Sequence, residues 1–172
     1  MKEIEVKILD ARHELLETKI IALGAHKVLD CLVNSVFFKG HNLDRMMRLR
    51  SLGDKYFLTV KERLSKEKAK ICNEYEVQVS DFEATRQLLG SLGFTECRIL
   101  VKKRVSYQLL DVKFEFDTYL GEFEFIPEFL EIEAKSIESI YLHAKILGFG
   151  EKDCKPWSWS DLVKHYEKNR NI

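Results

Sequence analysis

The chain has 172 residues, 45% of them hydrophobic, which is enough for one folded domain and excludes a disordered polypeptide. Lys and Arg total 28, as do Asp and Glu, so the chain lacks the basic surplus of a general nucleic-acid-binding protein. No apolar run approaches a membrane span, and the charged first residues differ from a signal peptide. We therefore expect a single cytoplasmic domain over 1–172 that binds neither nucleic acid nor membranes.

The chain begins with a strand pattern and continues into a helix pattern. Residues 2–9 alternate charged and apolar side chains, which is the period of a strand with one apolar face. Asp10 then has the side chain of a helix N-cap. The helix is expected to continue to about Leu23 and to end at Gly24.

The next segment is rich in β-branched and aromatic residues and in turn signals. Strands are expected over 27–39, 46–52, 55–63 and 71–79. Gly40, His41 and Asn42 predict a polar turn after the first of these strands. Gly53-Asp54 predicts a hairpin between the second and third. Residues 64–70 are polar and are expected to form a solvated loop.

The second half of the chain contains the remaining elements. Helices are expected over 81–92, capped by Asp81, and over 138–147, with Gly93 and Gly148 at their ends. Strands are expected over 96–109, 112–118 and 129–135. The aromatic loop 118–128 is equally compatible with two interpretations: that it forms the rim of a site, or that it only packs against the rest of the domain. Trp157 and Trp159 are expected to pack at the terminus, next to a short helical stretch. The total is about eight strands and three main helices.

The polar faces of these strands carry almost only long ionic side chains, because residues two apart share a face. They are Glu3, Glu5, Lys7, Arg48, Arg50, Lys61, Arg63, Glu74, Glu76, Lys102, Arg104, Lys113, Glu115, Asp117, Glu131, Glu133 and Lys135. An open sheet with this face in water is the alternative, but a solvated face would gain from mixing the two signs. Eight antiparallel strands can instead close into a barrel around one small ligand.

The grouping of like charges indicates which kind of ligand the barrel would bind. Carboxylates that face one another repel unless a cation joins them, and carboxylate oxygens suit Mg²⁺ or Mn²⁺. Arginine offers a planar fork that matches phosphate oxygens. The combination suits a metal-bound polyphosphate. The sequence has no Gly-rich phosphate loop, so side chains would have to bind the phosphates.

The order of these residues matches a known family. Glu3-Ile-Glu5-Val-Lys7 has the form ExExK, and the matching residues that follow are Arg48, Arg50, Lys61, Glu74, Glu76, Lys102, Arg104, Asp117, Glu131 and Glu133. This arrangement resembles the CYTH superfamily, the triphosphate tunnel metalloenzymes. One departure is Lys39 after Phe37-Phe38, where family members often carry an acid.

The resemblance implies an α+β fold, an eight-stranded antiparallel β-tunnel (a closed barrel) with helices packed outside. It implies that Mg²⁺ or Mn²⁺ would be held by Glu3, Glu5, Asp117, Glu131 and Glu133. Substrate phosphates would be held by Lys7, Arg48, Arg50, Lys61, Lys102 and Arg104. Lys7 would help to activate water in a hydrolytic member, with Glu5 and Glu133 as further catalytic residues. Arg63, Lys113, Glu115 and Lys135 are expected to form salt bridges of the tunnel.

Three functions are compatible with such a tunnel. The first, which we favour, is a metal-dependent triphosphatase that cleaves a phosphoanhydride of inorganic triphosphate, thiamine triphosphate or a nucleotide. The second is a class IV adenylyl cyclase, which converts ATP to cyclic AMP and pyrophosphate. The third is a non-catalytic polyphosphate-binding module. In each case the partner is a small-molecule triphosphate, and the chain is expected to be a monomer or a homodimer.

Overall fold

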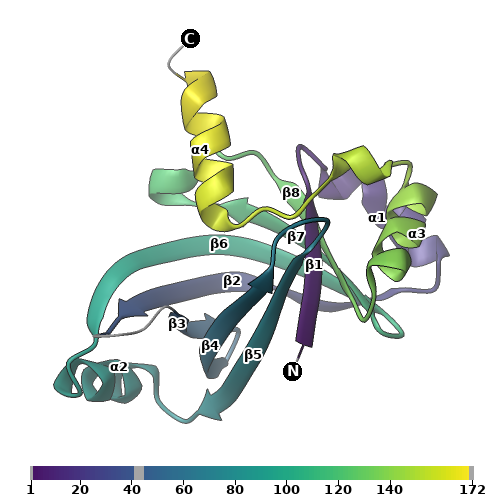
Figure 1. The fold of residues 1–172 in the computed structure, drawn as a ribbon. Helices are drawn as coiled ribbons and strands as arrows, with labels where there is room; N and C mark the ends of the chain where they lie inside the picture. Colours follow the sequence, from purple (N-terminus) through teal and green to yellow (C-terminus); the bar gives the residue numbers. More distant parts are fainter. Residues whose placement is uncertain (1, 41–44, 171–172) are drawn as a thin grey trace.

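The computed structural model describes residues 2–40 and 45–170 (Figure 1). His41 and Asn42 of the expected turn lie outside the described residues. The strands are β1 (Lys2–Ile8), β2 (His26–Lys39), β3 (Met46–Leu52), β4 (Lys55–Ser65), β5 (Lys70–Val79), β6 (Thr95–Leu109), β7 (Val112–Tyr119), β8 (Phe129–Ala134) and β9 (Cys154–Lys155). The helices are α1 (His13–Ala22), α2 (Phe82–Ser91), α3 (Ile137–Leu147) and α4 (Trp159–Arg170), with short 3₁₀ turns η1 (Gly121–Phe123) and η2 (Glu151–Asp153).

The sheet closes on itself. Its strands follow the order β5-β4-β3-β2-β6-β7-β8-β1, and β1 pairs on its other side with β5. Every pairing is antiparallel. The two-residue β9 adds to the end of β1 at Lys7 and Ile8. The expected closed eight-stranded barrel is therefore confirmed, with one short extra strand.

Alternation of side chains explains why the barrel has an ionic interior and an apolar exterior. Successive residues of a strand point to opposite faces, so the apolar set of β1, β7 and β8 faces outward toward helices. Figure 1 shows α1 and α3 together on one side of the barrel. The core between these helices and the barrel contains Val6, Phe114, Ile132 and Ile140, each of which is 0% exposed. Each such side chain contributes roughly 1.5–3 kcal/mol when buried.

A second apolar cluster lies under α4. It contains Phe37, Leu100, Tyr119, Phe123, Ile126, Phe129, Leu162 and Val163, with Trp157 and Trp159 partly buried against it. Phe123 and Ile126 come from the aromatic loop 118–128, so this loop is a packing surface for α4. The two tryptophans pack at the terminus as expected. In the described parts of the chain, no helix is both long and apolar enough to cross a membrane.

Two helix expectations need correction. Asp10 is not the N-cap of α1, because the helix begins at His13 and its N-cap is Arg12. Asp10 instead has a left-handed backbone with φ 52°, and its carboxylate accepts a hydrogen bond of 2.9 Å from the Tyr166 hydroxyl. The short helical stretch expected near the end is α4, a full helix of 12 residues. The cap of α2 is confirmed, since Asp81 accepts a 2.8 Å hydrogen bond from Ala84 N.

The solvated loop expected over 64–70 is shorter than expected, because β4 continues to Ser65 and β5 begins at Lys70, although Glu67 and Lys68 are exposed. Ala69 and Lys70 are only 2% and 8% exposed. Lys66 pairs with Asp161, which also accepts a 2.7 Å hydrogen bond from Ser158 N at the start of α4. The connection between β4 and β5 is therefore bound to the N-terminal turn of α4. Burial raises the pKa of Asp161, but Lys66 and Ser158 outweigh burial and lower it to about 2.

We expect Asp161→Asn to lower the free energy of unfolding by about 1 kcal/mol at pH 7, because a charge-assisted cap is lost. A carboxyl with a depressed pKa stabilises the fold above its unfolded pKa and loses this contribution as pH falls through the folded value. The difference from wild type should therefore shrink to about half at pH 3. Urea unfolding of wild type and Asp161→Asn at pH 7 and pH 3 measures this difference in the free energy of unfolding. Glu167→Gln, an exposed change on the same helix, is the control, and a difference independent of pH would contradict the assignment.

Candidate functional site

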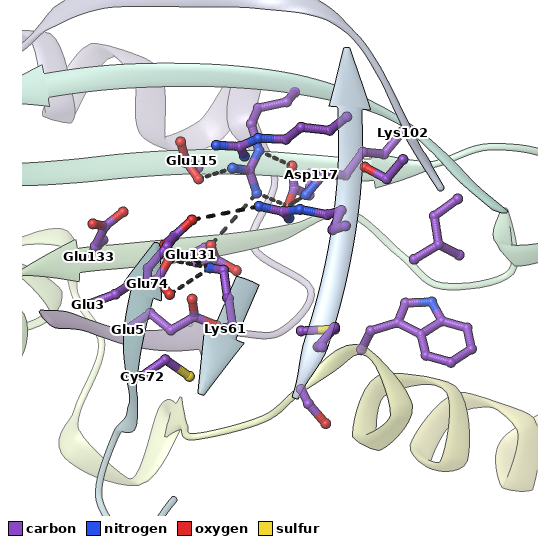
Figure 2. Close-up of a pocket in the computed structure, with 18 of the residues that line it drawn as sticks. Glu3, Glu5, Lys61, Cys72, Glu74, Lys102, Glu115, Asp117, Glu131 and Glu133 are labelled. Carbon is purple, nitrogen blue, oxygen red and sulfur yellow. Dashed lines mark hydrogen bonds and ion pairs between the residues drawn. The ribbon is translucent and has the colours of Figure 1, made fainter. Parts of the chain in front are cut away.

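The barrel encloses a cavity of about 1230 Å³. All of the sequence-predicted site residues line it: Glu3, Glu5, Lys7, Arg48, Arg50, Lys61, Lys102, Arg104, Asp117, Glu131 and Glu133. Figure 2 shows Glu3, Glu5, Glu74, Glu131 and Glu133 gathered on one side of this cavity. Arg63, Lys113 and Glu115 also line it. Lys113 and Glu115 form the expected ion pairs, with Glu133 and Arg104, whereas Arg63 has none in the described residues. Lys135 does not, because β8 ends at Ala134, and the Lys135 side chain is 82% exposed and lies 3.7 Å from Asp111.

One network of buried charges lies where β1 meets β5 and β8. Register places Glu5 opposite Lys70 and Lys7 opposite Glu131. Lys7 Nζ and Lys70 Nζ both lie 2.9 Å from Glu5 Oε1, and Lys7 also pairs with Glu131. Burial and Glu131 raise the pKa of Glu5, but the lysines around it outweigh them and lower it to about 2. Burial lowers the pKa of Lys7, but Glu131 and Glu5 raise it well above its usual value.

Lys70 was missed in the sequence because it was assigned to the loop before β5. The signal was present: Lys70, Cys72, Glu74 and Glu76 are spaced by two residues and share one face of β5. Extending the alternation upstream to residue 70 would have placed this lysine in the cavity.

A second network joins β6 and β7. Arg104 and Asp117 face each other in register, with Nε to Oδ1 at 2.7 Å and Nη2 to Oδ2 at 2.5 Å. Arg104 also pairs with Glu115, and Lys102 Nζ lies 2.6 Å from Asp117 Oδ2. Burial and the neighbouring Arg104 lower the pKa of Lys102 to about 8, although Asp117 opposes the shift. An additional anion near Lys102 would therefore stabilise its charged form.

The arginines of β3 are less completely paired. Arg50 lies 2.8 Å from Glu76, and Arg48 lies 3.9 Å from Glu74, beyond hydrogen-bond distance. The Nε atoms of both arginines are buried without a hydrogen-bond partner in the described parts of the chain. Burial, followed by the charge of Arg50, lowers the pKa of Arg48 to about 10, because Glu74 only partly offsets them. This part of the wall therefore has donors that an anion could use.

Some carboxylates are also incompletely neutralised. Burial, and then the charge of Glu5, raise the pKa of Glu3 to about 7, even though Lys61 lies 2.6 Å away. Burial likewise raises the pKa of Glu133, with Lys113 opposing the shift. Glu5 lies directly opposite Glu133 in register. Like charges in facing positions are unfavourable unless a cation lies between them.

These acids fit a hard divalent cation by their chemistry, since the carboxylate oxygens on facing strands are the donors that Mg²⁺ and Mn²⁺ prefer. Over residues 2–40 and 45–170, however, no three acidic, histidine or cysteine side chains converge on one point as metal ligands. The carboxylates contact lysines and arginines instead. A bound ion would therefore have to replace ammonium partners of Glu3, Glu5 or Glu133.

Comparisons with known proteins show which chains this one is similar to. A protein of Methanocaldococcus jannaschii that bears the name "Putative adenylate cyclase" is 29% identical over 153 residues, 86% of this chain and 84% of that protein. A solved structure from Pyrococcus horikoshii has a TM-score of 0.79 at 29% identity and covers 93% of this chain and 98% of its own.

A structure from Hippeastrum, described as a "putative adenylyl cyclase" with a dominant triphosphatase activity, has a TM-score of 0.59. It covers 95% of both chains at 15% identity, so this likeness shows the fold alone. The model of the CYTH domain matches residues 1–144. That match covers β1 to β8 and every site residue described above, and the chain therefore belongs to the CYTH domain family.

Proposed function

We propose that the protein binds the triphosphate of a small molecule inside the barrel together with Mg²⁺ or Mn²⁺ and cleaves one of its phosphoanhydride bonds. The observation that carries the proposal is the incomplete pairing of Arg48 and Arg50, whose buried Nε donors face a cavity otherwise filled with ion pairs. A phosphate chain offers these donors the acceptors that the protein lacks. Arginine's planar fork suits phosphate oxygens in particular.

The residues divide into two groups by charge. Glu3, Glu5, Asp117, Glu131 and Glu133 would hold the ion, which when bound would neutralise charge on the phosphates. Lys7, Arg48, Arg50, Lys61, Lys102 and Arg104 would hold phosphate oxygens. Lys7 remains an ammonium at neutral pH, because its pKa is raised, so it is suited to orient a phosphate or a water molecule rather than to remove a proton.

Cyclisation of ATP is the second candidate, and the name of the Methanocaldococcus jannaschii protein favours it. The triphosphatase activity described for the Hippeastrum protein favours hydrolysis. Both reactions require charge neutralisation and in-line positioning of the same phosphates, so the same tunnel serves either one. We place hydrolysis first because most polar groups that line the cavity are charged side chains, which suit phosphates and a metal.

We expect triphosphate or ATP to be cleaved when Mg²⁺ or Mn²⁺ is present and to remain intact in excess EDTA. Separate incubations with the two substrates, followed by ³¹P NMR, identify the products. Orthophosphate supports hydrolysis, whereas pyrophosphate with cyclic AMP would assign the protein as a cyclase. Full turnover in a verified metal-free preparation would exclude the proposed ion.

Glu133→Gln should abolish turnover while leaving the fold nearly as stable as wild type, because this carboxylate contacts one partly exposed lysine, Lys113, at 3.1 Å. Glu5→Gln should also abolish turnover, but it should cost about 3–5 kcal/mol of stability, since Lys7 and Lys70 lose their shared partner in the interior. Turnover and urea unfolding of both variants test the two roles separately. Wild-type turnover in either variant would refute the proposed metal ligands.

Arg48→Lys keeps the charge but loses the planar fork, so triphosphate binding should weaken by about 1–3 kcal/mol. Calorimetric titration of triphosphate into wild type and variant measures the loss. The matched control is Arg45→Lys, the same change at an exposed arginine that pairs with Glu62 and does not line the cavity. An equal affinity for wild type and Arg48→Lys would remove the main support for the proposed function.

A further inference from the structure

One cation of the cavity wall has no role in the site described above. Arg98 lies on β6 and lines the cavity together with Ser158 and with Trp159 and Ser160, the first two residues of α4. Register places it in one row with the phosphate-binding candidate Arg48, because both face Phe37 across neighbouring strands. Two strand spacings separate the backbones of the two arginines, about 10 Å. Arg98 therefore extends the cationic wall toward α4.

The contacts of Arg98 are aromatic rather than acidic. Its guanidinium carbon lies 3.7 Å from the ring centroid of Trp159 and 5.7 Å from that of Phe37. In the described parts of the chain, no carboxylate lies within 4.0 Å of it. Cavity cations such as Lys7, Lys61 and Arg104 do contact carboxylates. Stacking fixes the plane of a guanidinium while leaving the donors at its edge available.

The surroundings of Arg98 favour an anion over an aromatic ring. One face of the Trp159 indole is covered by the guanidinium, and Phe123 meets the same indole edge to face at 4.9 Å. The indole is therefore packed as a support for Arg98. Trp159 Nε1 is buried and has no hydrogen-bond partner in the described residues, which adds a second donor without an acceptor. The Ser158 and Ser160 hydroxyls, 2.9 Å apart, line the same end of the cavity.

We propose that Arg98, which lies over the ring of Trp159, is a specificity-determining residue that binds a second anionic group of the substrate at the α4 end of the tunnel. This inference rests on the proposed function, because it assumes phosphates at Arg48 and Arg50. It assigns the substrate to a narrower class, that of linear phosphate chains longer than triphosphate. A nucleoside at this end would meet a cation and unpaired donors where an acceptor-rich group fits better.

The test is calorimetric titration of the full chain, in chelator, with sodium tripolyphosphate, sodium tetrapolyphosphate and ATP. Arg98→Gln should weaken tetrapolyphosphate binding about tenfold, the effect of losing one charge-assisted contact. Tripolyphosphate and ATP should change by less than about twofold. Lys103→Gln is the matched control, since it removes the same charge from the same strand at an exposed residue that lies 3.6 Å from Asp30 and does not line the cavity.

The outcomes separate the subsite from the proposed function. If no phosphate chain binds to wild type, either in chelator or with Mg²⁺ added, the proposed function fails. If tripolyphosphate binds and Arg98→Gln leaves tetrapolyphosphate unchanged, the subsite is wrong. Equal losses for both chains would place Arg98 at the same phosphates as Arg48 and would also overturn it. Loss of ATP binding alone would assign Arg98 to a base, contrary to the proposal.

Discussion

Barrel closure between β1 and β5 is the constraint on which the rest of the structure depends. It places the ionic faces of seven strands in a common interior, where their charges lose most of their hydration. A buried charge is tolerated only beside a partner, so the interior becomes a network of cross-strand ion pairs. Strand register decides the partners: Glu5 faces Lys70 across the closure, and Arg104 faces Asp117.

The network is uneven around the barrel. The walls formed by β1, β7 and β8 carry most of the acids, and they are bound by lysines and by Arg104. On the cavity wall, arginines come from β3 and β6, the two neighbours of β2, and Arg48 and Arg50 retain donors without partners. Although the chain has zero formal net charge, one part of the barrel interior thus carries mostly carboxylates and another part carries arginines. Such fixed, desolvated charges need little reorganisation when a ligand of matching charge enters.

Most of the barrel and its interior could be predicted from sequence, because side-chain direction in a strand depends only on the parity of the residue number. The sequence-based predictions were wrong where the end of a strand was misplaced or where a local capping signal was overridden by a distant contact. Lys135 follows the parity of β8 but lies past its end, whereas Lys70 obeys the parity of β5 and was read as loop. Asp10 has the side chain of a cap, yet its partner is Tyr166, 156 residues away. Arg48 and Arg50 lack hydrogen-bond acceptors because of the distances between side chains on different strands, and a local sequence pattern does not contain these distances.

The position of β1 has a consequence for how the chain folds during synthesis. β1 is synthesised before the other described strands and lies between β5 and β8, so its second neighbour is complete only after residue 134 has been made. Until then Glu5 and Lys7 belong to an unpaired strand edge with an apolar outer face. Contacts this distant in sequence slow folding, and unpaired edges promote aggregation. The earliest of the described strands is thus the last to be enclosed, and barrel assembly waits for the synthesis of β8.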